Sequence, residues 1–140
     1  MTSETFNAAL HLQRIVTHNL QYQHYWTSLT SHTHQAPPTD SVKTDLRLPR
    51  PLISGYPPEP IYLTDIGESK PLGLEQEIVL PVHLSEKWTL KMWAEVFDTL
   101  PAIDGIEEER KRRVLLAVVS SDSTVVYYIV HDGIAKPRQN

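Results

Sequence analysis

Apolar residues along the first third of the chain recur every three to four positions, while histidine and arginine fall between them. The apolar stripe consists of Ala8, Ala9, Leu12, Ile15, Val16 and Leu20. This spacing predicts an amphipathic helix. The pattern fades near Ser31, and Pro37 and Pro38 would end any helix that reached them. We therefore predict an N-terminal helix within residues 1–34.

The next stretch, residues 35–60, is rich in proline. Regular helix is excluded there, so we expect an extended segment laid over the surface of the domain. Two short strands are predicted after it, Ile61–Asp65 and Glu77–Leu84. Pro81 lies inside the second of these and predicts an edge strand or a bulge, because proline cannot donate to a sheet.

A second helix is predicted to begin after Ser85, which has the side chain of a helix N-cap. Its apolar face would comprise Trp88, Met92, Trp93, Val96, Phe97 and Leu100. Pro101 would close the helix.

The chain then predicts a β-hairpin. Val114–Val119 and Thr124–Val130 are rich in β-branched and aromatic residues, and Ser121-Asp122 marks the turn between them. The order of elements predicts a small α/β domain, in which a mixed sheet is flanked by helices. Residues 61–140 would form its core, and all 140 residues fit one domain.

Composition narrows the classes of function. The chain has no cysteine, which removes disulfides and thiolate zinc sites and agrees with a reducing compartment. The N-terminus shows no secretory signal pattern. A net charge of −4 argues against a protein that holds nucleic acid by bulk electrostatics, although it leaves room for a local patch.

Histidines are the first candidates for chemistry. His24, His32 and His34 are the closest set among seven, but no carboxylate lies among them at ligand spacing. Asp40, the nearest, follows two prolines. We therefore predict no metal site and no cofactor, and interpret these histidines as scattered polar side chains.

A charged run, residues 107–113, ends in three adjacent cations. Lys111, Arg112 and Arg113 are candidates for contact with an RNA backbone or an acidic partner, and the alternative is a solvated turn. Trp88 and Trp93 are interpreted as core residues, whereas the role of Trp26 stays open. The sequence has no phosphate-binding glycine loop and no HExxH or GxSxG motif.

Taken together in their order, several segments resemble the tRNA-intron endonuclease family. The segments are residues 113–133, the ending Ile134–Asn140, and upstream His24-Tyr25-Trp26, Leu48–Gly55 and Leu80–Trp88. Among members of that family, the chain is most similar to small structural subunits of the eukaryotic tRNA-splicing endonuclease. The resemblance implies a fold like the C-terminal domain of these endonucleases.

The resemblance also implies partners. In this family two of four subunits cut RNA and two are structural, and the last strand of one subunit pairs with its counterpart in another. The expected partner is a catalytic subunit and, through it, the other two subunits and precursor tRNA. In isolation the same strand would pair two copies into a homodimer. The implied interface comprises Asp122, Thr124, Val125, Val126, Tyr127, Tyr128, Ile129 and Val130.

Active members of the family cleave RNA with a tyrosine, a histidine and a lysine. Arg112 falls where the lysine is expected, with Lys111 one residue earlier, and neither tyrosine nor histidine occurs between Leu100 and Arg113. We therefore expect no catalytic residues and a non-catalytic subunit. The alternatives are a small RNA-binding adaptor and a stand-alone nuclease. The resemblance implies a nuclear location, or else the cytosolic face of the mitochondrial outer membrane, without membrane insertion.

Overall fold

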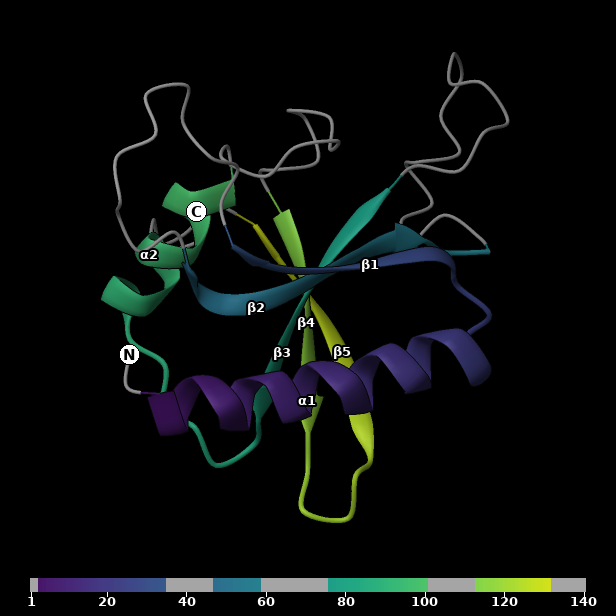
Figure 1. Ribbon diagram of the computed structural model, residues 1–140, viewed down its shortest axis with the longest axis horizontal. Helices are drawn as coiled ribbons and strands as arrows, with labels where there is room; N and C mark the ends of the chain where they lie inside the picture. Colours follow the sequence, from purple (N-terminus) through teal and green to yellow (C-terminus); the bar gives the residue numbers. More distant parts are fainter. Residues whose placement is uncertain (1–2, 35–46, 59–75, 101–112, 132–140) are drawn as a thin grey trace, which may run out of the picture.

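Five strands form one mixed sheet, with a helix packed on each face (Figure 1). The computed structural model describes residues 3–34, 47–58, 76–100 and 113–131. In chain order the elements are α1 (Ser3–Tyr22), β1 (Thr27–His34), β2 (Arg47–Tyr56), β3 (Glu77–His83), α2 (Leu90–Thr99), β4 (Arg113–Val119) and β5 (Val125–His131). The predicted α/β class, with a small mixed sheet and flanking helices, is confirmed. Neither described helix is long and apolar enough to cross a membrane.

The strands lie in the order β1-β2-β3-β4-β5. Neighbours are antiparallel except β3 and β4, which are parallel. A parallel pair needs a long crossover, and α2 lies within that connection. The arrangement leaves β1 and β5 as the two edges of the sheet.

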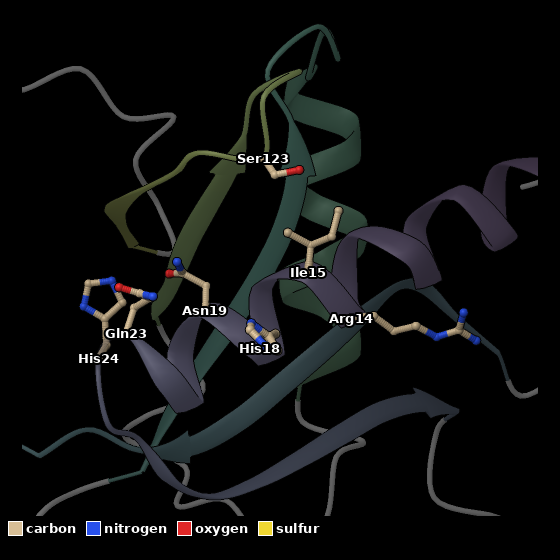
Figure 2. A pocket seen from close by; sticks show the side chains of 7 residues that line it. All are labelled: Arg14, Ile15, His18, Asn19, Gln23, His24 and Ser123. Atoms are coloured by element: carbon tan, nitrogen blue, oxygen red, sulfur yellow. The ribbon is translucent and has the colours of Figure 1, made fainter.

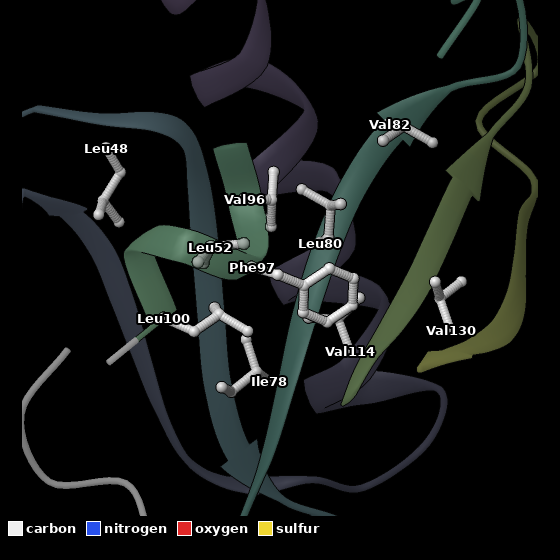
Figure 3. Packing of buried hydrophobic residues seen from close by; sticks show 10 residues of the cluster. All are labelled: Leu48, Leu52, Ile78, Leu80, Val82, Val96, Phe97, Leu100, Val114 and Val130. Atoms are coloured by element: carbon white, nitrogen blue, oxygen red, sulfur yellow. The ribbon is translucent and has the colours of Figure 1, made fainter. Parts of the chain in front are cut away.

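Successive side chains of the inner strands point to opposite faces of the sheet, which divides the core into two clusters. On one face Val96 and Phe97 of α2, with its C-cap residue Leu100, pack against alternate strand residues such as Leu80 and Val114 (Figure 3). On the other face α1 covers the intervening residues. That second cluster contains Leu12, Val16, Leu20, Trp26, Ile53, Val79, Leu115, Ala117 and Val119. Because β3 and β4 are buried on both faces, their sequences are almost continuously apolar.

The predicted N-terminal helix is wrong in its last third. α1 ends at Tyr22, and the chain reverses through Tyr25, whose φ of 59° is left-handed. The Trp26 N–H donates to the Leu20 carbonyl at 3.0 Å, which places the buried indole against α1. Residues 27–34 then form a strand, favoured by threonine rather than by an apolar period.

The prediction that residues 35–60 are a surface segment is wrong for β2. This strand lies between β1 and β3, and Leu48, Leu52 and Ile53 are at most 2% exposed. The prolines of β2 fit because its pairing with β1 is irregular at that point. His32 pairs with Leu52 and His34 with Arg47, so Pro49 and Pro51 lie among the unpaired residues between them. Residues 35–46 lie outside the described part of the chain.

The prediction of an edge strand at Pro81 is also wrong, since β3 is the central strand. β2 pairs with β3 only as far as Val79, so proline's missing N–H breaks no bond there. The Pro81 carbonyl instead accepts from Arg50 Nη2 at 3.0 Å. The predicted strand Ile61–Asp65 lies outside the described residues.

α2 begins later than predicted. Its N-cap is Thr89, which accepts from the Met92 N–H at 3.3 Å. Ser85 lies in the turn after β3 and is hydrogen-bonded to His83 Nδ1 at 2.7 Å. Trp88 therefore precedes the helix, where its ring packs on Trp93 with centroids 4.7 Å apart.

A buried ion pair joins the beginnings of β3 and β4. The Arg113 guanidinium donates from Nε to Glu77 Oε1 at 3.1 Å, and from Nη2 to Glu77 Oε2. Both residues are less than 10% exposed. The pair aligns the two parallel strands at the point where the crossover returns to the sheet.

Removing one member of this pair should destabilise the fold. Arg113→Met would leave the Glu77 carboxylate buried without its guanidinium, which costs about 3–5 kcal/mol. Urea unfolding of this variant measures the loss, with the double variant Arg113→Met/Glu77→Leu as control. We expect the double variant to recover much of the stability. Equal stability of Arg113→Met and the parent would show that Arg113 has no structural role.

Candidate partner interface

The turn between β4 and β5 is shaped by Asp122. Its Oδ1 accepts from Ser120 Oγ at 2.6 Å and from the Thr124 N–H at 3.1 Å. The backbone closes with Ser123 N to Ser120 O, and Ser123 has a φ of 67°. Hydrogen bonds from Ser120 and Thr124 lower the pKa of Asp122 to about 2, so an ionised carboxylate stands at the tip of the hairpin.

The same turn decides which backbone groups of β5 remain open. The Ser120 N–H donates to the Thr124 carbonyl at 2.9 Å, and bonded pairs alternate along an antiparallel hairpin. The groups of Val126, Tyr128 and Val130 therefore point to β4. Those of Val125, Tyr127 and Ile129 point away from it, along an edge that pairs with no other described strand.

One face of β5 packs on the domain's own helix. Val125, Tyr127 and Ile129 are half-buried beside the α1 cluster. The Tyr127 hydroxyl donates to Asn19 Oδ1 at 2.5 Å, and burial raises the pKa of Tyr127. This bond ties the hairpin to α1.

The other face of β5 is apolar and exposed. Val126 is 47% exposed and Tyr128 is 56% exposed, whereas Val130 is buried under the α2 cluster. Across the hairpin they pair with Val118 and Leu116, which are only partly buried. The strand thus carries an apolar strip directly beside its open edge, a combination typical of binding surfaces.

The opposite edge of the sheet lacks these properties. β1 has two register shifts against β2, and Ser28 has a φ of 53°. Its sequence, TSLTSHTH, is polar. Bulges and polar side chains protect an edge from pairing, so of the two edges only β5 is suited to receive another strand.

The proposed RNA contact by Arg113 is wrong, because its guanidinium is buried and paired with Glu77. Lys111 and Arg112 lie outside the described residues. The sequence shows only that the three cations are adjacent. The partner of Arg113, Glu77, lies 36 residues away and becomes its neighbour only in the fold.

The histidines considered for a metal site have separate environments. His24 meets Tyr127 edge to face with ring centroids 5.3 Å apart. His32 Nε2 lies 2.7 Å from Ser54 Oγ, and burial lowers the pKa of His32. His34 Nδ1 lies beside the Thr33 hydroxyl. Among the residues that the structure describes, no three histidine or carboxylate side chains form a metal-binding group.

Sequence analysis did not find the contacts that hold the N-terminal half in place. Trp26, whose role the sequence does not decide, is a buried core residue of the α1 cluster. Arg50 is buried, pairs with Glu86, and lies 5.4 Å from the Trp88 ring centroid. Although desolvation raises the pKa of Glu86, hydrogen bonds from Arg50 and the His83 N–H lower it overall. Both partners of Arg50 lie more than 30 residues away, so only the fold reveals them.

Comparison with known proteins places the chain in a family. Residues 15–140 match the family model described as "Sen15 protein". A relative from Neurospora crassa, named "Probable tRNA-splicing endonuclease subunit tsp-1", is 35% identical over 165 positions, covering 96% of this chain and 69% of the relative. The match includes β5 and its turn. The chain belongs to the Sen15 protein family.

Proposed function

We propose that this chain is a non-catalytic structural subunit of the tRNA-splicing endonuclease, the complex that excises introns from precursor tRNA. The relative from Neurospora crassa is named as a subunit of that enzyme. The observation that carries the proposal is the edge of β5, which is regular, apolar and open among the described residues. A chain of this family with such an edge is built to extend a partner's sheet.

The proposed absence of catalysis rests on the residues before β4. RNA cleavage needs a base near the 2′-hydroxyl and an acid near the leaving oxygen. The sequence between Leu100 and Arg113 contains neither tyrosine nor histidine. Arg113, the first residue of β4, is held by Glu77 and is not available to RNA.

The proposed partner is a catalytic subunit that adds its own strand beside β5. The backbone groups of Val125, Tyr127 and Ile129 would bond to it, and Val126 and Tyr128 would contact its apolar side chains. Without that partner, two copies can join through the same edge in a symmetric dimer. We also propose a nuclear location, or else the cytosolic face of the mitochondrial outer membrane. The resemblance to the family is what supports this location.

Proline at position 129 tests the edge. The Ile129 N–H points away from β4, so Ile129→Pro removes no bond of the hairpin but blocks the added strand. We expect association with the catalytic subunit to weaken roughly tenfold or more, measured by calorimetry. The matched control is Ile129→Ala, which shortens the same side chain but keeps the N–H and should bind more tightly than the proline variant.

A second control separates binding from folding. Tyr128→Pro removes an N–H that points to β4, so it should damage the hairpin itself, visible by circular dichroism. If Ile129→Pro remains folded and binds the catalytic subunit as tightly as Ile129→Ala does, the interface does not use this edge.

The charge of Asp122 can be tested without disturbing the turn. Asp122→Asn keeps the Oδ1 acceptor for Ser120 and Thr124 but removes the negative charge. If this charge meets a basic surface in the complex, the association rate should fall roughly two- to fivefold, and its salt dependence should weaken. Stopped-flow association at two salt concentrations measures both. Unchanged rates in the Asn variant would remove Asp122 from the interface.

A further inference from the structure

Carboxylates are absent from a long segment of this acidic protein. Residues 5–34 contain no aspartate or glutamate, although the chain has 17. The same segment holds five of the seven histidines, and Arg14 is its one residue with a formal charge. In the fold this segment comprises α1 from Thr5 onward, the turn after it, and β1 (Figure 1). Neither β1 nor α1 from Thr5 onward therefore contributes an acidic side chain to the surface.

Two hollows flank the outer side of α1. The larger, of about 550 Å³, lies between α1 and the β4–β5 turn (Figure 2). It is lined by Arg14, Ile15, His18, Asn19, Gln23, His24 and Ser123. The smaller, of about 230 Å³, shares Arg14 and His18 and extends to Gln21, Tyr22 and Ser31. We call the two hollows and the helix between them the α1 groove.

The α1 groove is held in shape by the core. Asn19 accepts from the Tyr127 hydroxyl, which ties the wall of the larger hollow to β5. The His18 ring packs on Tyr22 with centroids 4.6 Å apart. At the end of the helix, Tyr22 is 57% exposed and Tyr25 is 71% exposed. Two aromatic rings are therefore presented to solvent beside hydrogen-bond donors.

We propose that the α1 groove binds a single-stranded segment of precursor tRNA, an inference that rests on the proposed function. Arg14 and the histidines would contact phosphates, and the amides of Asn19 and Gln23 would bond to phosphate or 2′-hydroxyl oxygens. Tyr22 and Tyr25 would stack on unpaired bases. From His11 to Tyr22 the helix rises about 16 Å, enough to follow several phosphates of one strand.

The chemistry of the α1 groove favours RNA over a protein partner. A helix that docks on a protein partner does so through apolar side chains on its exposed face. Here the exposed large hydrophobic residues are tyrosines, while Leu84, Leu90 and Val126 are exposed on other elements. The turn carries one ionised carboxylate, Asp122, so the contacts to the strand would come from the side chains of α1 rather than from the turn. Because the α1 groove has one arginine, it would orient an RNA strand whose affinity comes mainly from other parts of the complex.

Charge reversal in the assembled complex tests this proposal. Arg14→Glu should weaken binding of fluorescently labelled, intron-containing precursor tRNA roughly fivefold or more, and should lower the slope of log affinity against log salt by about one. Lys91→Glu is the matched control, since Lys91 is exposed on α2, across the sheet. It makes the same charge change and should leave both quantities at the parent value.

Stacking is tested at Tyr22. Tyr22→Ala should reduce the affinity for precursor tRNA roughly fivefold, and Tyr22→Phe, which keeps the ring, should restore it. Co-purification with the catalytic subunit is measured for every variant. Complexes that assemble normally and bind tRNA like the Lys91→Glu complex overturn the groove proposal while the proposed function stands. Loss of assembly in Arg14→Glu, with tRNA affinity unchanged in the complexes that do form, marks a protein-binding surface and equally overturns it.

Discussion

The hydrogen bonds of the β4–β5 turn are the constraint on which both surfaces of this protein depend. The Ser120–Thr124 pair fixes the register, and the register decides which residues of β5 bond to β4. Alternate side chains of a strand point to opposite faces, so a slip of one residue would exchange them. Tyr127 would then leave Asn19, and the exposed Val126 and Tyr128 would turn toward α1. Asp122 stabilises the one register that avoids this.

Tyr127 connects the two surfaces. Its side chain contacts Asn19 and His24, which line the larger hollow, while its backbone belongs to the open edge of β5. Two partners of different chemistry can therefore use one small domain without competing for the same atoms. In the two proposals, the apolar edge of β5 would receive a protein strand, and the part of α1 from Thr5 onward, which has no carboxylate, would contact RNA. The net charge of −4 describes neither surface, because the carboxylates are distributed unevenly along the chain.

The sequence predicted the parts of the fold whose signals are local. The β4–β5 hairpin and β3 followed from apolar, β-branched runs, and α1 followed from its period. β1 was missed because threonine, serine and histidine give no apolar pattern. β2 was missed because Pro49 and Pro51 argue against a strand unless a bulge accommodates them, and that bulge lies in β2 itself, between Arg47 and Leu52. That bulge is a property of the assembled sheet.

The candidate sites divide in the same way. The alternation within Thr124–Val130 was readable from the sequence, whereas the inward or outward direction of each N–H depends on the turn. Arg113 was grouped with Lys111 and Arg112 because they are adjacent. Its carboxylate partner, Glu77, is brought to it only by the parallel pairing of β3 and β4. Long-range pairs of this kind decide whether a cation is structural or free to bind.

Residue-resolved amide hydrogen exchange tests the central claim, that β5 offers one row of backbone groups to a partner. In solution dilute enough to dissociate the proposed homodimer, the amides of Val126, Tyr128 and Val130 should exchange slowly, and those of Val125, Tyr127 and Ile129 quickly. Adding the catalytic subunit should slow this second set roughly tenfold or more and so remove the alternation. If the second set still exchanges quickly in the complex, the partner binds elsewhere and the account is wrong.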